Sequence, residues 1–379
     1  MNACPSPDRH GFDPVSLDTL AHASDDDEEA HPGTRIAGLA ADGWLSACLP
    51  VSAGGHGIGT SAEPGAIRLT SDVLRALGRA NLALARLYEG HVNAVKLVEM
   101  HAAPALRELV RRRVRAGTLL GVWGATAADP LTVTSASADG WTLDGAKAFT
   151  SGLGIVALAV VPVADPHEPA RSRLLLVDVD DPERQRPGDW RASGMRATRS
   201  GSYRFDGVRL APERVLGAPG VYEREPWFEG GIWRYLAAHV GAMEALVDEL
   251  VAQLRARGRD TDPHQGARIG RTAGLAFAAR ALVERVALEV ETADPNDPMA
   301  IDRAVALALG ARESIEDGAV ETIRLVERSL GMAAFERGQR MERLRRDLGL
   351  YLRQAAPDAK LARAAATIAG TGRGIGDWW

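Results

Sequence analysis

Cysteine is nearly absent from this sequence, since the 379 residues include only Cys4 and Cys48. Two cysteines do not make a disulfide framework in a chain of this length. The sequence also has no CxxC pair and no Cys/His cluster with the spacing of metal ligands. We therefore expect a reduced protein without a metal site.

Long apolar runs are lacking as well. No uninterrupted run is long enough to span a bilayer, and no charged segment followed by an apolar one forms a signal peptide. The net charge is −5, and no basic stripe interleaved with aromatic residues marks a nucleic-acid surface. We expect a cytoplasmic protein that binds neither nucleic acid nor a membrane.

Aromatic residues make up only 5% of the chain, whereas the hydrophobic residues as a whole make up 46%. Alanine and leucine supply much of this apolar content, which favours packed helices. The length and the amount of core material allow more than one domain.

The residue pattern changes three times along the chain. Residues 1–33 are polar and form an expected loosely attached tail. Residues 34–118 have the spacing of amphipathic helices, with a nearly continuous helix over 73–101 that Gly78 and Gly90 weaken. Residues 119–218 alternate between apolar and polar, with Gly and Pro at the breaks, as short antiparallel strands do. Residues 219–379 predict an up-and-down bundle of four long helices, the last interrupted at Pro357.

The expected fold class is therefore mainly α with a central, small β-domain. Two motifs lie in the β-domain, GAKAFTSG (145–152) and GMRATRSGSYRFDGVRLAPERVLG (194–217). A segment of small residues, GAT (124–126), precedes them. Thr, Ser and backbone N–H groups in loops between strands suit the polar edge of a flat cofactor ring, although Thr150 and Ser151 can equally serve a turn.

The element order and these motifs resemble the acyl-CoA dehydrogenase superfamily of flavoproteins over most of residues 34–370. The resemblance implies an antiparallel, barrel-like middle domain and FAD as cofactor, with FMN as the other possibility. It also implies a homodimer or homotetramer. By the same resemblance, the residues that contact the flavin are Trp123, Thr126, Phe149, Thr150, Ser151, Arg257 and Gly331.

Two motifs are similar to one branch of this superfamily, the flavin-dependent monooxygenases that include dibenzothiophene monooxygenase. They are GxKxF(T/C)SG and DWxxxGMRxTxSGS. In that branch a helical histidine and the serine of the SG pair lie near the reactive position of the flavin. The matching positions are His91 and Ser151, although a lone helical histidine is more often structural.

The chain departs from the dehydrogenase pattern where that pattern needs a base. Removal of a weakly acidic α-proton from a thioester requires a positioned carboxylate. The two positions that the resemblance assigns to this glutamate hold Trp233 and Ala355. Glu229, one helical turn before Trp233, is a candidate for a relocated base, and a first-turn carboxylate is its other interpretation.

The monooxygenase pattern is also incomplete, because Gln354 stands where that branch has a C-terminal histidine. Gln354 can form hydrogen bonds but cannot carry a proton. We therefore expect a flavin-dependent oxidoreductase that oxygenates a small molecule with reduced flavin from a flavin reductase. The alternatives are an acyl-thioester dehydrogenase that passes electrons to an electron-transfer flavoprotein, and a catalytically silent scaffold.

Overall fold

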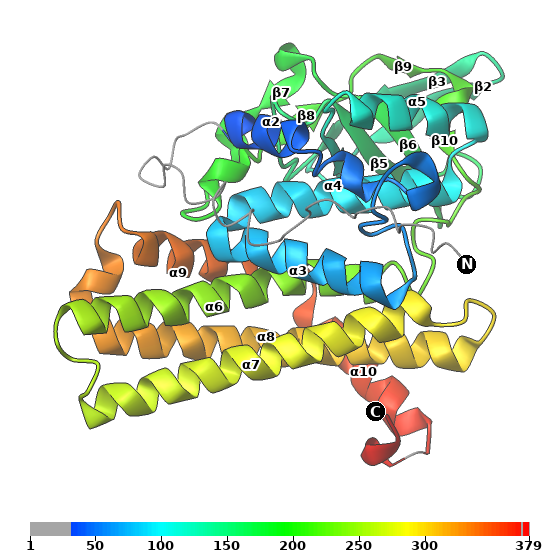
Figure 1. The fold of residues 1–379 in the computed structure, drawn as a ribbon. Helices are drawn as coiled ribbons and strands as arrows, with labels where there is room; N and C mark the ends of the chain where they lie inside the picture. The colour runs from blue at the N-terminus through cyan, green and yellow to red at the C-terminus, as the bar shows by residue number, and fades with distance from the viewer. Residues whose placement is uncertain (1–31, 373, 379) are drawn as a thin grey trace, which may run out of the picture.

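The computed structural model describes residues 32–372 and 374–378 (Figure 1). The polar tail expected over residues 1–33 falls almost entirely outside this range. None of the helices in the described part of the chain is long and apolar enough to cross a membrane.

Within the described residues, four α-helices precede the strands: α2 (Gly33–Ala41), α3 (Pro64–Ala80), α4 (Leu82–His101) and α5 (Pro104–Arg115). The helix expected over 73–101 is two helices, because the chain breaks at Asn81, whose Oδ1 accepts a hydrogen bond from the N–H of Leu84 at 3.0 Å. An asparagine side chain that caps the first turn in this way favours a new helix start. Gly78 and Gly90 both lie inside helices.

The strands form three small sheets with the orders β1-β5-β6-β10, β2-β3-β9 and β4-β8-β7. Their bounds are β1 (Leu120–Val122), β2 (Thr132–Ser137), β3 (Gly140–Asp144), β4 (Ala146–Lys147), β5 (Leu158–Ala164), β6 (Ser172–Asp178), β7 (Gln185–Arg186), β8 (Ser202–Arg204), β9 (Val208–Leu210) and β10 (Val215–Leu216). Most pairs are antiparallel as expected, but β1 pairs with β5 in parallel. The described strands close no barrel, so the barrel-like expectation was wrong on this point.

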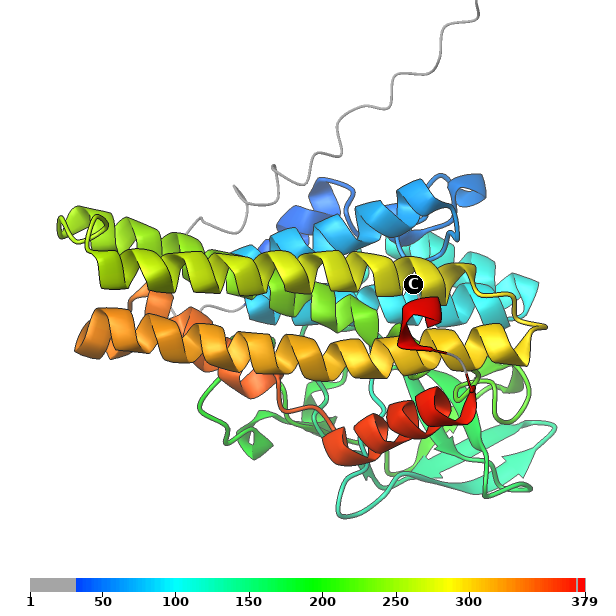
Figure 2. The same ribbon diagram turned by 90° about the horizontal axis from the view of Figure 1, so that it is seen from below.

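Five helices follow the strands: α6 (Trp233–Ala256), α7 (Pro263–Thr292), α8 (Pro298–Leu330), α9 (Arg340–Tyr351) and α10 (Pro357–Gly370). The expected interruption at Pro357 separates α9 from α10, and Pro357 occupies the first position of α10. α7 and α8 lie side by side, and α10 packs on α8 (Figure 2).

Two glycines let α3 approach α6 closely. A Cβ built on Gly241 would lie 1.9 Å from the carbonyl oxygen of Arg75, and one built on Gly78 would lie 2.1 Å from that of Ala238. This contact sets the order of layers: the sheets, then α4, then α3 with α6, and then α7 with α8 (Figure 1). The carboxyl end of β1 therefore faces α4 and the start of α6.

Candidate functional site

The GAT and FTSG segments, separated by more than twenty residues, lie against each other. The N–H of Ala148 donates to the carbonyl of Ala125 at 3.1 Å, and Thr126 forms a β-bridge with Lys147. The indole Nε1 of the buried Trp123 donates to the carbonyl oxygen of Ser151 at 3.0 Å. Five of the seven residues predicted to contact flavin thus share one surface of the strand region.

Phe149 lies on this surface in an unusual conformation. Its φ is +52°, which side chains of this size rarely adopt, and its side chain is 65% exposed. The edge of its ring faces Trp190, with centroids 6.1 Å apart. Backbone strain that presents an aromatic ring to solvent is typical of a binding surface rather than of a core.

Ser151 begins a chain of hydroxyl groups. Its Oγ lies 3.0 Å from Oγ of Ser200, which lies 2.7 Å from Oγ1 of Thr198, and Thr198 donates to the carbonyl of Met195 at 2.7 Å. A carbonyl can only accept, so each proton in the chain points away from Ser151. Ser151 therefore offers lone pairs to a ligand.

The loop that holds Ser200 and Thr198 is fixed by α9. The buried carboxylate of Asp347 accepts a hydrogen bond from the N–H of Met195 at 2.7 Å. Gly194 allows the close approach, since a Cβ there would lie 2.8 Å from the carbonyl oxygen of Arg346. Burial raises the pKa of Asp347, although the Met195 N–H and Arg346 favour its charged form.

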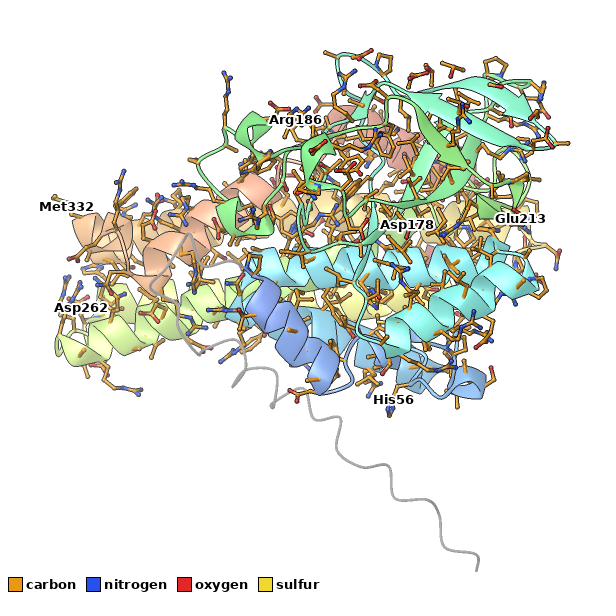
Figure 3. The ribbon with its side chains drawn as sticks, turned by 90° about the horizontal axis from the view of Figure 1, so that it is seen from above. His56, Asp178, Arg186, Glu213, Asp262 and Met332 are labelled. Atoms are coloured by element: carbon orange, nitrogen blue, oxygen red, sulfur yellow. The ribbon has the colours of Figure 1, made fainter. Side chains whose placement is uncertain are left out.

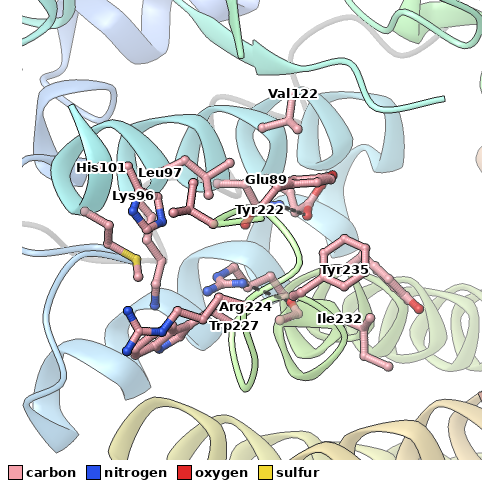
Figure 4. Close-up of a pocket in the computed structure, with 16 residues that line it drawn as sticks. Glu89, Lys96, Leu97, His101, Val122, Tyr222, Arg224, Trp227, Ile232 and Tyr235 are labelled. Carbon is pink, nitrogen blue, oxygen red and sulfur yellow. Dashed lines mark hydrogen bonds between the residues drawn. The ribbon is translucent and has the colours of Figure 1, made fainter. Parts of the chain in front are cut away.

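A cavity of about 190 Å³ opens where α4, the end of β1, the segment 221–232 and the start of α6 meet (Figure 4). Its apolar and aromatic lining includes Leu97, Val122, Tyr222, Trp227, Phe228 and Tyr235. Its charged and titratable lining is Glu89, Lys96, His101, Arg224 and Arg234. A much smaller cavity of about 10 Å³, lined by Arg86, Trp123 and Ser151 among others, shares Val122 with it. Through Val122, the 190 Å³ cavity therefore adjoins the small cavity beside Ser151 of the GAKAFTSG motif.

Glu89 is the one carboxylate in the described lining of the large cavity, and it is fully engaged. Its Oε2 lies 2.5 Å from Nη1 of Arg86, and its Oε1 accepts a hydrogen bond from Nδ2 of Asn93. A carboxylate that accepts from both neighbours has little freedom to approach a substrate.

A polar cluster lies behind Tyr235. The His239 ring lies 5.3 Å from the Tyr235 ring and 4.6 Å from that of Tyr351. Both nitrogens of His239 and the hydroxyl of Tyr351 are buried without a hydrogen-bond partner among the described residues. Burial, together with the nearby Arg312, lowers the pKa of His239 to about 3, so the imidazole is neutral. Unpaired buried polar atoms beside a cavity indicate room for a polar ligand or water.

His91 lies on α4 near this region, but both ring nitrogens are committed to the backbone. Nδ1 accepts from the N–H of Leu120 at 3.0 Å, which leaves the proton on Nε2, 3.1 Å from the carbonyl oxygen of Leu45. Burial lowers the pKa of His91 to about 4. In this conformation His91 ties α4 to β1 and to the segment before α3.

The two other predicted catalytic positions lie outside the described cavity lining. Glu229 pairs with Arg363 on α10, and Arg363 also pairs with Glu225 at 3.0 Å. Gln354 donates from Nε2 to the carbonyl of Tyr351 at 2.7 Å. Neither side chain reaches the motif surface in this structure.

The two positions where a dehydrogenase would carry its base also lack access to the cavity. Trp233 is fully buried and donates from Nε1 to Glu291 at 3.0 Å, whereas Ala355 is exposed after α9.

Arg257 and Gly331 lie at the other end of the bundle. Arg257 follows α6 and donates to Gln253 at 3.3 Å, and Gly331 ends α8 with φ +61°. Figure 3 shows Met332 and Asp262, neighbours of these positions, at the end of the molecule away from Glu213 in the strand region. Arg257 and Gly331 can contact a cofactor that binds near Phe149 and Ser151 only if the far end of that cofactor extends along the bundle. Otherwise they can contact only a cofactor that is bound by a second copy of the chain.

The motif surface fits a flat, polar-edged ring. The exposed aromatic ring of Phe149, the acceptor Ser151 and the unpartnered, buried hydroxyl of Thr150 lie within three consecutive residues. Within residues 32–372 and 374–378, no group of three or more His, Cys, Asp or Glu side chains could hold a metal ion. The exposed ring, the acceptor and the unpartnered hydroxyl are groups of the kind that suit a flavin.

Comparison with known proteins gives the same architecture. No protein-family model matches the chain. Dibenzothiophene monooxygenase from Mycolicibacterium goodii is 26% identical to it over 196 residues, 48% of this chain and 45% of that protein. The match thus spans less than half the length of the curated relative.

Solved structures match over nearly the whole chain. The FMN-bound TdsC of Paenibacillus sp. A11-2 has a TM-score of 0.81 at 20% identity and covers 94% of this chain and 96% of its own. KijD3 in complex with FMN and a dTDP-amino-keto sugar has a TM-score of 0.77 at 19% identity, covering 96% and 93%. The fold expected from the motifs, that of the acyl-CoA dehydrogenase-like flavoproteins, is confirmed, and so is the resemblance to the dibenzothiophene monooxygenase branch.

Proposed function

We propose that this chain, which has the fold of acyl-CoA dehydrogenase-like flavoproteins, is a flavin-dependent monooxygenase that acts on a small molecule in the 190 Å³ cavity. One observation carries the proposal: the surface formed by Phe149, Thr150 and Ser151 adjoins a cavity whose one lining carboxylate is already engaged. Such a site suits oxygen transfer better than proton abstraction.

Reduced flavin supplies two electrons to O₂, so that one oxygen atom enters the substrate and the other leaves as water. The residues of this chain position the reaction. Phe149 would support the flat ring and Ser151 would accept a hydrogen bond from one of its N–H groups, while the buried side chains Trp123 and Val156 would exclude water behind them.

The polar cluster behind Tyr235 is proposed to serve the oxygen-transfer side of the cavity. The Tyr351 hydroxyl and the His239 ring, which lack partners among the described residues, are available to bind water or a polar substrate group. The monooxygenase branch has a histidine at the position of Gln354. His239 is proposed to take over its role, because it brings an imidazole to the same region from α6.

We propose FMN as the cofactor, since both structural neighbours named above contain it, with FAD as the alternative that the chain's motifs also allow. The electrons are proposed to come from a separate flavin reductase in the cytoplasm. A homodimer or homotetramer is proposed as well, because Met332 and Phe335 are exposed beside Gly331 at the end of the bundle, and Phe277 is exposed halfway along α7.

A second function, thioester dehydrogenation, is favoured by one feature: Glu89 is a carboxylate at the cavity wall. It would have to leave Arg86 and Asn93 to act as a base. The relocated base considered from the sequence, Glu229, would likewise have to leave Arg363. The monooxygenase proposal requires neither change.

Stopped-flow absorbance tests the proposal. Protein with bound, chemically reduced FMN is mixed with oxygenated buffer, and free reduced FMN is the reference. We expect the bound flavin to reoxidise through a transient whose spectrum differs from those of oxidised and reduced flavin. Reoxidation in one step at the rate of free flavin would contradict oxygenase chemistry.

A further inference from the structure

We infer that the substrate of this site is an anion, whose carboxylate or phosphate group binds at the end of the cavity formed by Lys96, Arg224 and Arg234. The inference rests on the proposed function, because it names the class of substrate that the same cavity takes.

Positive charge at this end of the cavity exceeds negative charge. Lys96 on α4 and Arg234 on α6 are both buried, and they share a single carboxylate, that of Glu291 on α7. Nη2 of Arg234 lies 2.8 Å from Oε1 of Glu291, an oxygen that also accepts from Trp233. One carboxylate balances one of the two cations, and a buried cation without a counter-charge is costly.

Arg224 adds a third cation. It forms no ion pair with any described carboxylate, and its guanidinium lies over the ring of Trp227, 5.6 Å from the centroid. His101 lines the same end of the cavity, so four nitrogen-containing side chains meet there: Lys96, His101, Arg224 and Arg234. An exposed arginine held on an aromatic face keeps its N–H donors available for a ligand.

Arg234 also retains an unused donor. Its Nε is buried without a hydrogen-bond partner, although Nη1 donates to the carbonyl of Gly231 at 3.0 Å. Gly231 makes room for this side chain, because a Cβ there would lie 2.6 Å from Nη1. The start of the 24-residue helix α6 borders the cavity as well, and the N-terminus of a helix favours negative charge.

The charged side chains are distributed unevenly along the cavity. Figure 4 shows His101 and Lys96 on one side and Glu89 with Tyr235 on the other. The charge of Glu89 is already paired with Arg86, whereas positive charge is in excess at Lys96, so the substrate is oriented with its charged group at Lys96 and its uncharged part toward Val122 and Tyr222. Val122 also lines the small cavity beside Ser151, where the reaction is proposed to occur.

Isothermal titration calorimetry on the full, flavin-free chain tests the inference with three probes of similar size: phenylacetate, phenyl phosphate and 2-phenylethanol. We expect at least one anion to bind ten times more tightly than the neutral alcohol. The preferred anion then identifies the substrate group as a carboxylate or as a phosphate. Equal or tighter binding of 2-phenylethanol would overturn the inference.

Two variants localise the effect. Arg224→Gln removes an exposed cation, and Lys96→Met leaves Arg234 and Glu291 as a balanced pair. Each is expected to weaken anion binding at least fivefold without changing the affinity for the alcohol. Arg209→Gln, which removes an exposed arginine on β9, is the matched control and should leave all three affinities unchanged.

Unchanged anion affinity in both folded variants would overturn the assigned location. Flavin binding is followed separately by visible absorbance. A protein that binds FMN but shows no preference for anions contradicts only this inference. A protein that binds no flavin contradicts the proposed function, whatever the probes show.

Discussion

Nη1 of Arg86 lies 2.5 Å from Oε2 of Glu89, one helical turn away on α4, and each partner lines a different cavity. Arg86 lines the small cavity beside Ser151, and Glu89 lines the large one. The boundary between the two cavities therefore includes a partly buried ion pair as well as Val122, which lines both.

Glu89→Gln should destabilise the protein by about 1–3 kcal/mol, because it leaves the partly buried charge of Arg86 without its partner. The double variant Arg86→Met/Glu89→Gln should recover much of this loss. Urea denaturation measures both. Glu321→Gln, in the exposed i,i+3 pair with Arg324 on α8, is the control and should cost no more than about 1 kcal/mol. Equal losses of stability in Glu89→Gln and Glu321→Gln would contradict burial of the pair between Arg86 and Glu89.

Phe149→Ala should weaken FMN binding about fivefold, because loss of an aromatic contact of this kind removes on the order of 1 kcal/mol. Its melting temperature should hardly change, since the ring is 65% exposed. Flavin fluorescence titration gives the affinity. Phe277→Ala, which removes a ring on α7 that is 71% exposed, should bind FMN as the unaltered protein does. A Phe149 variant with full affinity would place the flavin elsewhere.

Ser151→Ala should retain FMN but slow oxygen transfer by about 10²-fold, the typical cost of losing one oriented hydrogen-bonding group in an active site. The stopped-flow transient and its decay report the effect. Ser137→Ala, in the exposed β2–β3 hairpin, is the matched control. Normal kinetics in the Ser151 variant would leave the hydroxyl chain with a structural role only.

The pKa of His91, lowered by burial from 6.5 to about 4, makes stability depend on acid. As the pH falls below 6.5 the unfolded chain takes up a proton there, and the folded chain does so only near pH 4, so stability decreases with falling pH. Between pH 7 and pH 5 this histidine should account for a loss of about 2 kcal/mol.

His91→Gln removes that contribution, and an amide side chain can still donate to Leu45 and accept from Leu120. The variant should therefore lose about 2 kcal/mol less stability than the unaltered protein between the two pH values. His239, with its pKa lowered to about 3, retains its own contribution in both proteins. An identical loss in the variant would show that His91 is protonated in the folded state at pH 5.

The sequence predicted the fold because order and pattern suffice for it. Alternation over 132–137 and 173–179 predicts strands, and the structure has β2 at 132–137 and β6 at 172–178. The long amphipathic segments after Gly220 predict the helices. It also predicted that the GAT and FTSG segments border the same site, and the structure brings Ala125 and Ala148 together. A sequence motif indicates the local backbone geometry around a site, so a contact between two motif segments, such as that of Ala125 with Ala148, can be predicted from it.

Most of the cavity could not be predicted in this way. Glu89, Tyr222 and Tyr235 belong to no motif, and they meet because α4 and the segment before α6 pack together across more than 120 residues of sequence. The break at Asn81 was missed for a related reason. Gly78 was interpreted as a weak point, but its missing side chain serves the packing of α3 on α6, whereas the polar side chain of Asn81 starts α4. Only the tertiary contact distinguishes the two roles.

The parallel pairing of β1 with β5 could not be predicted from the sequence either, because the residue pattern of a three-residue strand does not indicate its direction. Its consequence is functional: it brings the end of β1, with Val122 and Trp123, to the edge of the cavity.

The most direct test of the central claim is the visible absorbance spectrum of the purified protein with FMN, followed by anaerobic addition of a panel of acyl-CoA thioesters. The account predicts that the flavin band remains with the protein after gel filtration and that no thioester bleaches it, whereas dithionite does. Bleaching by a thioester would show a dehydrogenase, with Glu89 the first residue to replace. A protein that retains no flavin would contradict both enzymatic functions.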